Sequence, residues 1–266
     1  MLTIGFVCPT YQAHELHAYT ERAISSFFKT TPNGVVILTD DASPDWASYK
    51  LKLEELRSSL NIAEDRFHIV RFDKEGKLTR SWNAGLRLAT YLKLDYAIAG
   101  NNDVIFTPQW HSGLLHALNN GYDLVGPLSN APGVTAKGLQ EVRHYTNKYI
   151  LSDRDEHLNA VAKDLYDKHL GKVVESPING FFQMAKVISW VKGKYSAEDF
   201  YRPLNKFTSK GKVNRTPLMT LNEDELQARW RKLNMKSAVV CSSYVFHYRA
   251  VSRGDKYKKG DAFRIK

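Results

Sequence analysis

Short apolar runs alternate with amphipathic stretches along the first half of the chain. Four apolar runs have the length of buried strands and lie at residues 3–8, 35–39, 67–72 and 96–99. Between them, apolar residues recur every three or four positions and predict helices over residues 15–29, 46–60 and 81–92. Strands and helices that alternate in this order predict an α/β domain, with a mainly parallel sheet flanked by helices.

The second half continues the α/β pattern less regularly. The same periodicities predict helices over residues 108–118, 148–170 and 223–234, and strands over 122–125, 180–185 and 237–241. A loop rich in glycine, proline, serine and asparagine is expected over residues 127–138. A chain of 266 residues can form one domain or two closely packed ones, and we expect a single domain.

Polar side chains follow the fourth predicted strand, at Asn101, Asn102 and Asp103. Ligands of parallel α/β sheets bind at the carboxyl ends of the strands, so Asp103 is a candidate metal ligand. An ordinary strand-to-loop turn would use the same residue types, because asparagine and aspartate side chains bond to nearby backbone. This stretch alone leaves both interpretations open.

The net charge is +10 at pH 7, and two segments account for all of the excess. Between Lys186 and Arg215 there are eight basic residues and two acidic ones, and between Arg249 and Lys266 there are seven and two. The rest of the chain is close to neutral. A local excess of this kind predicts a surface that binds a polyanion.

Composition and segment lengths describe an ordinary globular protein, with 43% hydrophobic and 25% charged residues. No apolar run approaches the roughly 18 residues of a membrane span, and the N-terminus lacks the basic region and cleavage site of a signal peptide. We therefore expect a cytoplasmic protein. Cys8 and Cys241 lie far apart in apolar segments without metal-type spacing, which favours buried free thiols.

Six short motifs lie at the ends of the predicted elements. They are Pro9-Thr10-Tyr11, Asp40-Asp41-Ala42-Ser43, Ser81-Trp82-Asn83-Ala84-Gly85, Asn102-Asp103, Asn222-Glu223-Asp224-Glu225 and Val245-Phe246-His247. In this order, and with this placement after strands and at helix starts, they resemble the motifs of GT-A glycosyltransferases of the family-2 type. The resemblance spans residues 4 to about 248.

The resemblance implies a nucleotide-sugar-binding half at residues 1–126, an acceptor-binding and catalytic half at 127–248, and a basic tail at 249–266. It also implies a UDP-sugar donor, with Asp40 or Asp41 accepting the imide N–H of uracil. A loop in which Asp41 or Ser43 caps the following helix is the structural alternative, and Ser81 can likewise be a simple N-cap. The implied donor-binding residues are Pro9, Thr10, Tyr11, Asp40, Asp41, Ser81, Asn83, Asn101 and Asn102.

Asp103 and His247 are the metal ligands that the resemblance implies. A carboxylate oxygen and an imidazole nitrogen suit Mn²⁺ and tolerate Mg²⁺, and the cation would stabilise a diphosphate leaving group. The family usually has Asp-x-Asp where this chain has Asn101-Asn102-Asp103, so one carboxylate is missing. His247 also fits a histidine that is satisfied within a β segment.

Asp224, with Glu223 beside it, is the candidate general base. A carboxylate near the acceptor hydroxyl accelerates direct attack on the anomeric carbon, which inverts its configuration. Neighbouring acids raise each other's proton affinity, which suits a base. The alternative is that these acids only stabilise the dipole of the helix that they begin.

Asn179 and Gly180 resemble the acceptor-side loop of the family, and a basic, aromatic segment follows them. Cations that bind phosphates beside aromatic rings that stack on bases favour a nucleic-acid acceptor. A resemblance to phage DNA-modifying glycosyltransferases implies a hydroxymethylated pyrimidine in DNA as the best candidate, and a phage protein in its host's cytoplasm. A surface glycan or lipid-linked acceptor is the second hypothesis, and an inactive nucleic-acid-binding protein is the third. The predicted acceptor-binding residues are Asn179, Gly180, Trp190, Lys192, Lys194, Tyr201, Arg202, Lys206 and Lys210.

Overall fold

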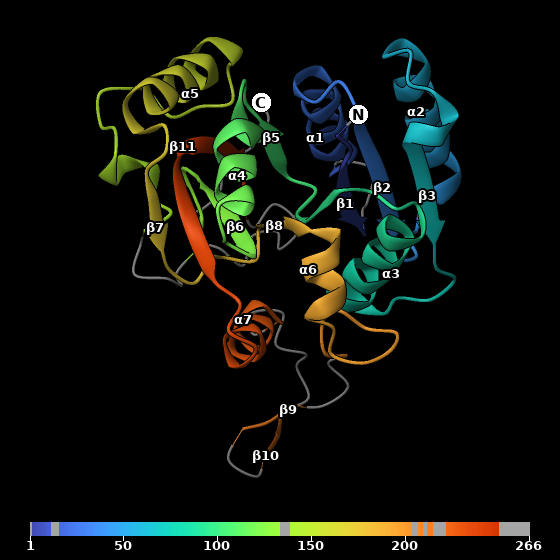
Figure 1. Cartoon of the computed structure of the whole chain (residues 1–266). Coiled ribbons are helices and arrows are strands. Elements are labelled where there is room, and N and C mark those ends of the chain that lie inside the picture. The colour runs from blue at the N-terminus through green and yellow to red at the C-terminus, as the bar shows by residue number, and fades with distance from the viewer. Residues whose placement is uncertain are drawn as a thin grey trace.

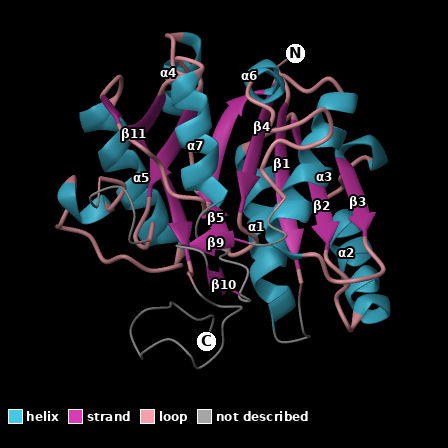
Figure 2. Ribbon diagram, turned by 90° about the horizontal axis from the view of Figure 1, so that it is seen from below, coloured by secondary structure: helices cyan, strands magenta, loops and turns pink. Residues whose placement is uncertain are grey.

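The computed structural model describes residues 2–11, 16–133, 139–203, 207–209, 212–214 and 222–249 (Figure 1). Four parallel strands form one half of its main sheet, in the order β3-β2-β1-β4 (Figure 2). They are β1 (Ile4–Thr10), β2 (Gly34–Asp40), β3 (Phe67–Arg71) and β4 (Tyr96–Gly100). The predicted parallel sheet is confirmed for these strands.

The other half of the sheet is mixed. Strand β8 (Phe182–Lys186) runs antiparallel between β4 and β6 (Leu124–Leu128), and β11 (Ser237–His247) lies parallel to β6. Two short strands, β5 (Val104–Phe106) and β7 (Val173–Glu175), pair antiparallel with β11. The register opposes Gly100 to Phe182 and His247 to Val104, so the end of β4, the start of β8 and the end of β11 lie along one edge.

Helices pack on both faces of the sheet. Alternate residues of a strand point to opposite faces, so an apolar strand presents apolar side chains to both. In β1, Phe6 and Cys8 belong to one apolar cluster, and Val7 belongs to the other. The first cluster is covered by α1 (His17–Thr30), α2 (Trp46–Ser59) and α4 (Trp110–Asn119). The second is covered by α3 (Lys77–Tyr91), α5 (Asp155–His169), α6 (Val187–Lys192) and α7 (Asn222–Lys232).

Three minor elements complete the description. Two are 3₁₀ turns, at Glu64–Arg66 and Val142–His144. The third is a separate antiparallel pair, β9 (Phe207–Ser209) and β10 (Lys212–Asn214). Among the residues described, no helix combines the length and the apolar character that crossing a membrane requires.

Several predicted boundaries are wrong. Helix α5 begins at Asp155 and not at residue 148, and strand β11 continues to His247 instead of ending at residue 241. Two further differences have identifiable reasons. Strand β1 continues through Pro9 to Thr10; its pairing with β4 ends at Val7, so the missing N–H of proline leaves no bond unmade on that side. Helix α3 begins at Lys77, four residues before Ser81. The cap comes from a distant residue, because the carboxylate of Asp41 accepts hydrogen bonds from the backbone N–H groups of Gly76 and Lys77.

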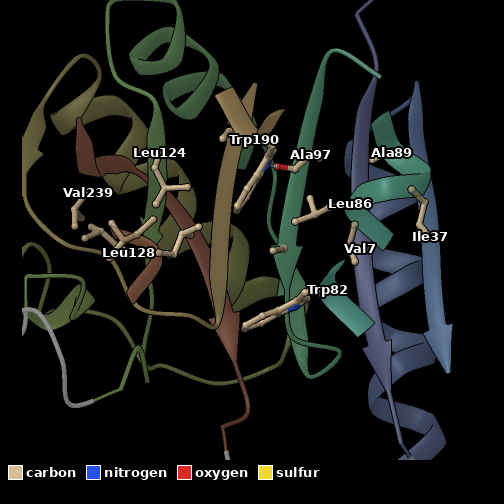
Figure 3. Packing of buried hydrophobic residues seen from close by; sticks show 14 of the residues in the cluster. Val7, Ile37, Trp82, Leu86, Ala89, Ala97, Leu124, Leu128, Trp190 and Val239 are labelled. Atoms are coloured by element: carbon tan, nitrogen blue, oxygen red, sulfur yellow. Dashed lines mark hydrogen bonds between the residues drawn. The ribbon is translucent and has the colours of Figure 1, made fainter. Parts of the chain in front are cut away.

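Trp190 and Tyr201 lie in the core, so their predicted contact with an acceptor is wrong (Figure 3 shows Trp190). The Trp190 indole is 1% exposed and donates to the carbonyl of Ala97 at 3.0 Å. Tyr201 is fully buried, and its hydroxyl donates to the side-chain oxygen of Gln183 at 2.5 Å. Aromatic and basic residues therefore interleave in this segment because its helix and loop are packed against the core on one side and exposed to solvent on the other.

Replacing Trp190 with alanine is expected to lower the free energy of unfolding by about 3–5 kcal/mol, because it removes a large buried ring and leaves the Ala97 carbonyl without its partner. Urea denaturation measures the change. Ile188→Ala is the matched control, since Ile188 is on the same helix but 74% exposed, and it should change stability by no more than about 0.5 kcal/mol. Equal effects of the two substitutions would contradict the assignment of Trp190 to the core.

Candidate active site

The carboxyl end of β4 brings three chain segments together. The backbone N–H of Asn101 donates to the carbonyl of Phe181, just before β8, at 2.9 Å. The backbone N–H of Tyr248, just after β11, donates to the carbonyl of Asp103 at 2.9 Å. Polar residues that are far apart in sequence therefore face one another at this edge.

Asp103 and His247, the two predicted metal ligands, are neighbours. Asp103 Oδ1 lies 3.2 Å from His247 Nε2, and the two residues are 8% and 5% exposed. His247 Nδ1 lies 2.8 Å from the carbonyl oxygen of Ala131. Because a carbonyl only accepts hydrogen bonds, Nδ1 carries a proton, and Nε2 is the nitrogen that can coordinate a metal.

This pair fits a divalent cation. A carboxylate oxygen and an imidazole nitrogen with its lone pair repel at this distance unless a proton or a cation lies between them. Among the described residues, no cluster of three or more histidine, cysteine or acidic side chains is formed. The protein thus offers one oxygen and one nitrogen, which suits Mn²⁺ and leaves other coordination positions for a ligand.

Stacking and hydrogen bonds fix the ring and the backbone of His247. The ring stacks on Phe181, with centroids 5.0 Å apart and an interplanar angle of 16°, and Asn101 Nδ2 lies 3.3 Å from Nε2. Asn130 pairs with the backbone of His247 through both of its amide atoms, at 2.9 and 3.0 Å. Sequence analysis missed Asn130, because an asparagine in a polar loop carries no signal of a partner more than a hundred residues away.

Glu223, not Asp224, is the acid that packs against Gly180, in the predicted acceptor-side loop. A Cβ atom on residue 180 would lie 3.0 Å from the carboxyl group of Glu223, so glycine lets the carboxyl group lie this close without having to shift. Burial raises the pKa of Glu223 to about 7; Asp224 adds to the shift, and hydrogen bonds from the backbone N–H groups of Glu223 and Gly180 oppose it. Asp224 is exposed.

One loop, residues 179–181, contacts both the Asp103–His247 pair and Glu223. Gly180 contacts Glu223, and the adjacent Phe181 stacks on His247. Asn179, also in this loop, is 3% exposed, and its Nδ2 has no hydrogen-bond partner among the described residues. A buried donor without a partner is costly, so this amide is suited to bind a ligand.

The two aspartates at the end of β2, Asp40 and Asp41, are bonded within the protein. Asp40 is fully buried, forms a 2.6 Å ion pair with Arg71 and accepts hydrogen bonds from the Ser43 backbone and the Thr10 hydroxyl. Asp41 caps α3 and pairs with Arg80. Contact of either residue with uracil stays a prediction. The alternative in which Asp41 caps the following helix is wrong, because the helix that Asp41 caps is α3 and not α2.

Asn83 and Ser81 have structural positions in α3. The Asn83 amide makes four hydrogen bonds to residues 199–201, so neither its oxygen nor its nitrogen is left to bind a nucleotide sugar. Ser81 is buried inside α3, so it is not an N-cap. The predicted donor contact of Asn83 is therefore corrected to a role in holding residues 199–201 against α3.

The remaining predicted residues are placed as follows. Pro9 is buried in β1, and Tyr11, directly after this strand, is 50% exposed. The backbone carbonyl of Thr10 accepts a hydrogen bond from the backbone N–H of Asp41 at 2.7 Å. The side-chain amide of Asn102 donates to the hydroxyl of Thr20 at 2.9 Å. Lys192 and Arg202 are exposed, and Lys194 donates to the carbonyl of Ala197. Lys206 and Lys210 lie outside the described residues.

The family model for glycosyl transferase family 2 matches residues 6–173, which is more than half of the chain. The chain belongs to glycosyl transferase family 2. The matched region of this family-2 chain includes Asp40, Asp41 and Asp103 but ends before Glu223 and His247. The predicted α/β, GT-A-like fold class is thus confirmed.

One of two similar solved structures supports the fold of this family-2 chain. GalNAc-T7, solved with UDP, GalNAc and Mn²⁺, superposes with a TM-score of 0.61 at 16% identity, covering 93% of this chain and 44% of that one. Residues 1–349 of S. aureus TarS give a TM-score of 0.49 at 13% identity, with 93% and 60% covered. The chain therefore spans less than two thirds of either structure. No curated protein matches.

Proposed function

We propose that this glycosyltransferase moves a sugar from a UDP-sugar to a hydroxyl acceptor with inversion, using a divalent cation and Glu223 as general base. The observation that carries the proposal is the arrangement of two chemically different centres on one loop: the Asp103–His247 pair beside Phe181, and Glu223 beside Gly180. The UDP and Mn²⁺ in the GalNAc-T7 structure support the choice of donor and cation.

Asp103 and His247 would hold the cation, which when bound stabilises the negative charge that develops on the leaving diphosphate. Glu223 accepts the proton of the acceptor hydroxyl as its oxygen forms a bond to the anomeric carbon. The bond from that carbon to the diphosphate breaks, and UDP leaves with the electron pair. Glu223 is preferred to Asp224 because a partly buried carboxyl with a pKa of about 7 matches the working pH of a base.

For the acceptor, we propose a hydroxymethylated pyrimidine in DNA. The local excess of basic residues supports it, with Lys192 and Arg202 exposed. Burial of Trp190 and Tyr201 removes part of the stacking argument, and Tyr195, 42% exposed with Arg202 near its ring, is the remaining candidate for stacking on a base. A glycan or lipid-linked acceptor is the alternative that the same charges would serve.

A panel of UDP-sugars with Mn²⁺ tests both levels of the proposal. Duplex DNA that contains hydroxymethylcytosine should gain one sugar mass per modified base, whereas unmodified duplex and neutral glycans should gain none. Because phosphate contacts release counterions, transfer should weaken about 10-fold or more between 50 and 200 mM salt. Transfer to glycans alone would replace the DNA acceptor, and binding of DNA without turnover of any UDP-sugar would favour the inactive binder.

A further inference from the structure

Gln227 of helix α7 bonds directly to the backbone of the acceptor-side loop. Its Oε1 accepts the backbone N–H of Ile178 at 2.7 Å, and its Nε2 donates to the carbonyl of the same residue at 2.9 Å. Gln227 is 3% exposed. An amide side chain offers the donor and the acceptor that satisfy both backbone groups of one residue, so no apolar or singly functional side chain can replace it.

Gln227 is also bonded within its own helix. Nε2 donates to the carbonyl of Glu223, one turn earlier, at 3.1 Å. The same amide thus joins the residue that bears the proposed base to the loop that bears Gly180, and Glu223 and Gly180 are in contact. A change at Gln227 would alter the separation between these two groups before it altered anything at the Asp103–His247 pair.

The loop is held independently from its other side. Gln140 accepts the backbone N–H of Asn179 at 2.6 Å and donates to the carbonyl of Pro127 at 2.9 Å. Further along α7, Trp230 donates to the carbonyl of Gly193 at 2.9 Å. Loop and helix therefore each keep other anchors without Gln227. Together with the contact between Glu223 and Gly180, Gln227 sets the position of one relative to the other.

We infer that Gln227 is a positioning residue, which holds the carboxyl group of Glu223 against the acceptor-side loop in the geometry that proton abstraction requires. This inference rests on the proposed function of Glu223. A base that is misplaced by about 1 Å loses on the order of 100-fold in rate even when every reacting group is present. Because Gln227 is buried and its side chain bonds to backbone groups, we expect its effect to fall on the chemical step.

Gln227→Met tests the inference, because methionine keeps the volume of the side chain and removes all three hydrogen bonds. We expect kcat to fall by about 10- to 100-fold with the KM for the UDP-sugar unchanged within about twofold. Without the contact, water reaches Glu223, so its pKa falls toward the ordinary carboxyl value and the acidic limb of the kcat/KM profile moves to lower pH. A lower rate from a base that is more fully ionised cannot be explained by protonation.

A second readout does not depend on activity. The titration of Glu223 can be followed by carbon NMR of glutamate-labelled protein, with its signal assigned from its loss in Glu223→Gln, and it should shift to lower pH in Gln227→Met. Tyr96→Phe is the control for a merely structural loss, because it removes the hydrogen bond from Tyr96 to Asn119 at the start of β4. It should leave kcat, the pH profile and the Glu223 titration at their wild-type values.

The outcomes separate this inference from the proposed function. Wild-type kcat and an unchanged Glu223 titration in Gln227→Met, together with loss of transfer in Glu223→Gln, would overturn the positioning role and leave the base in place. Full transfer by Glu223→Gln would overturn the base itself. An equal loss of kcat in Gln227→Met and Tyr96→Phe, without a shift of the acidic limb in either, would also overturn the inference, since it would reduce Gln227 to a general contributor to stability.

Discussion

Replacing Asp103 with alanine is expected to reduce Mn²⁺-dependent turnover of the UDP-sugar by roughly 10³-fold. By stabilising the negative charge that develops on the leaving group, the cation lowers the activation free energy by several kcal/mol. Each 1.36 kcal/mol corresponds to about tenfold in rate. His247→Ala should cause a similar loss, because its Nε2 is 3.2 Å from Asp103 Oδ1 and the two residues form one site. The double variant should be little worse than either single one, since ligands that act as a unit are not additive.

The measurement is release of UDP over a titration of Mn²⁺, with calorimetric binding of Mn²⁺ as a separate readout. Asp95→Asn is the matched control: Asp95 precedes β4 where Asp103 follows it, and it accepts hydrogen bonds from Thr3 at the far end of the strand. This variant should keep the metal dependence of the wild type. Undiminished Mn²⁺-dependent turnover by Asp103→Ala would end the metal assignment.

The first half of the fold can be predicted from the sequence, because its signals are local. Strands β1, β2 and β4 are continuous apolar runs that the sheet buries on both faces, and the intervening helices repeat apolar residues at helical spacing. The second half depends on long-range pairing. Nothing within residues 180–185 indicates that β8 runs antiparallel between β4 and β6, so the mixed character of the sheet was not predictable.

The candidate site divides in the same way. Asp103 and His247 belong to recognisable motifs, and their contact follows from the order of the strands once β11 ends opposite the start of β5. Residues that hold the site in place, such as Asn130 and Gln227, act by pairing with distant backbone. Their side chains carry no charge and follow no periodicity, so the sequence alone contains no signal for them.

The segment after β8 shows why a composition argument can mislead. Basic and aromatic residues alternate there, which is typical of a nucleic-acid surface. In the structure, Trp190 bonds to Ala97 and Tyr201 bonds to Gln183 inside the core, while Lys192 points to solvent. A short helix that is buried on one side produces the same pattern, because its two faces interleave in the sequence.

Glu223→Gln is expected to lower kcat by roughly 10²–10⁴-fold, the range that a positioned general base contributes. Glutamine keeps the size of the side chain and can still accept a hydrogen bond from the backbone N–H of Gly180, but it cannot take the acceptor's proton. Asp224→Asn is the control on the same turn; since Asp224 is exposed and is a lesser cause of the raised pKa of Glu223, it should change kcat by about twofold or less. A larger loss in Asp224→Asn than in Glu223→Gln would reassign the base to Asp224.

The pH dependence gives a second and independent test of Glu223. A base acts when deprotonated, so kcat/KM of the wild type should rise with pH and level off above a pKa of about 7, and this limb should be absent in Glu223→Gln. Stability should show the opposite trend. The folded protein retains a proton that the unfolded chain loses near its ordinary pKa of 4.5, so raising the pH from 4.5 through about 7 destabilises the fold. Glu223→Gln should remove that loss of stability as well. A variant that flattens the activity profile but leaves the pH dependence of unfolding unchanged would place the raised pKa on another group.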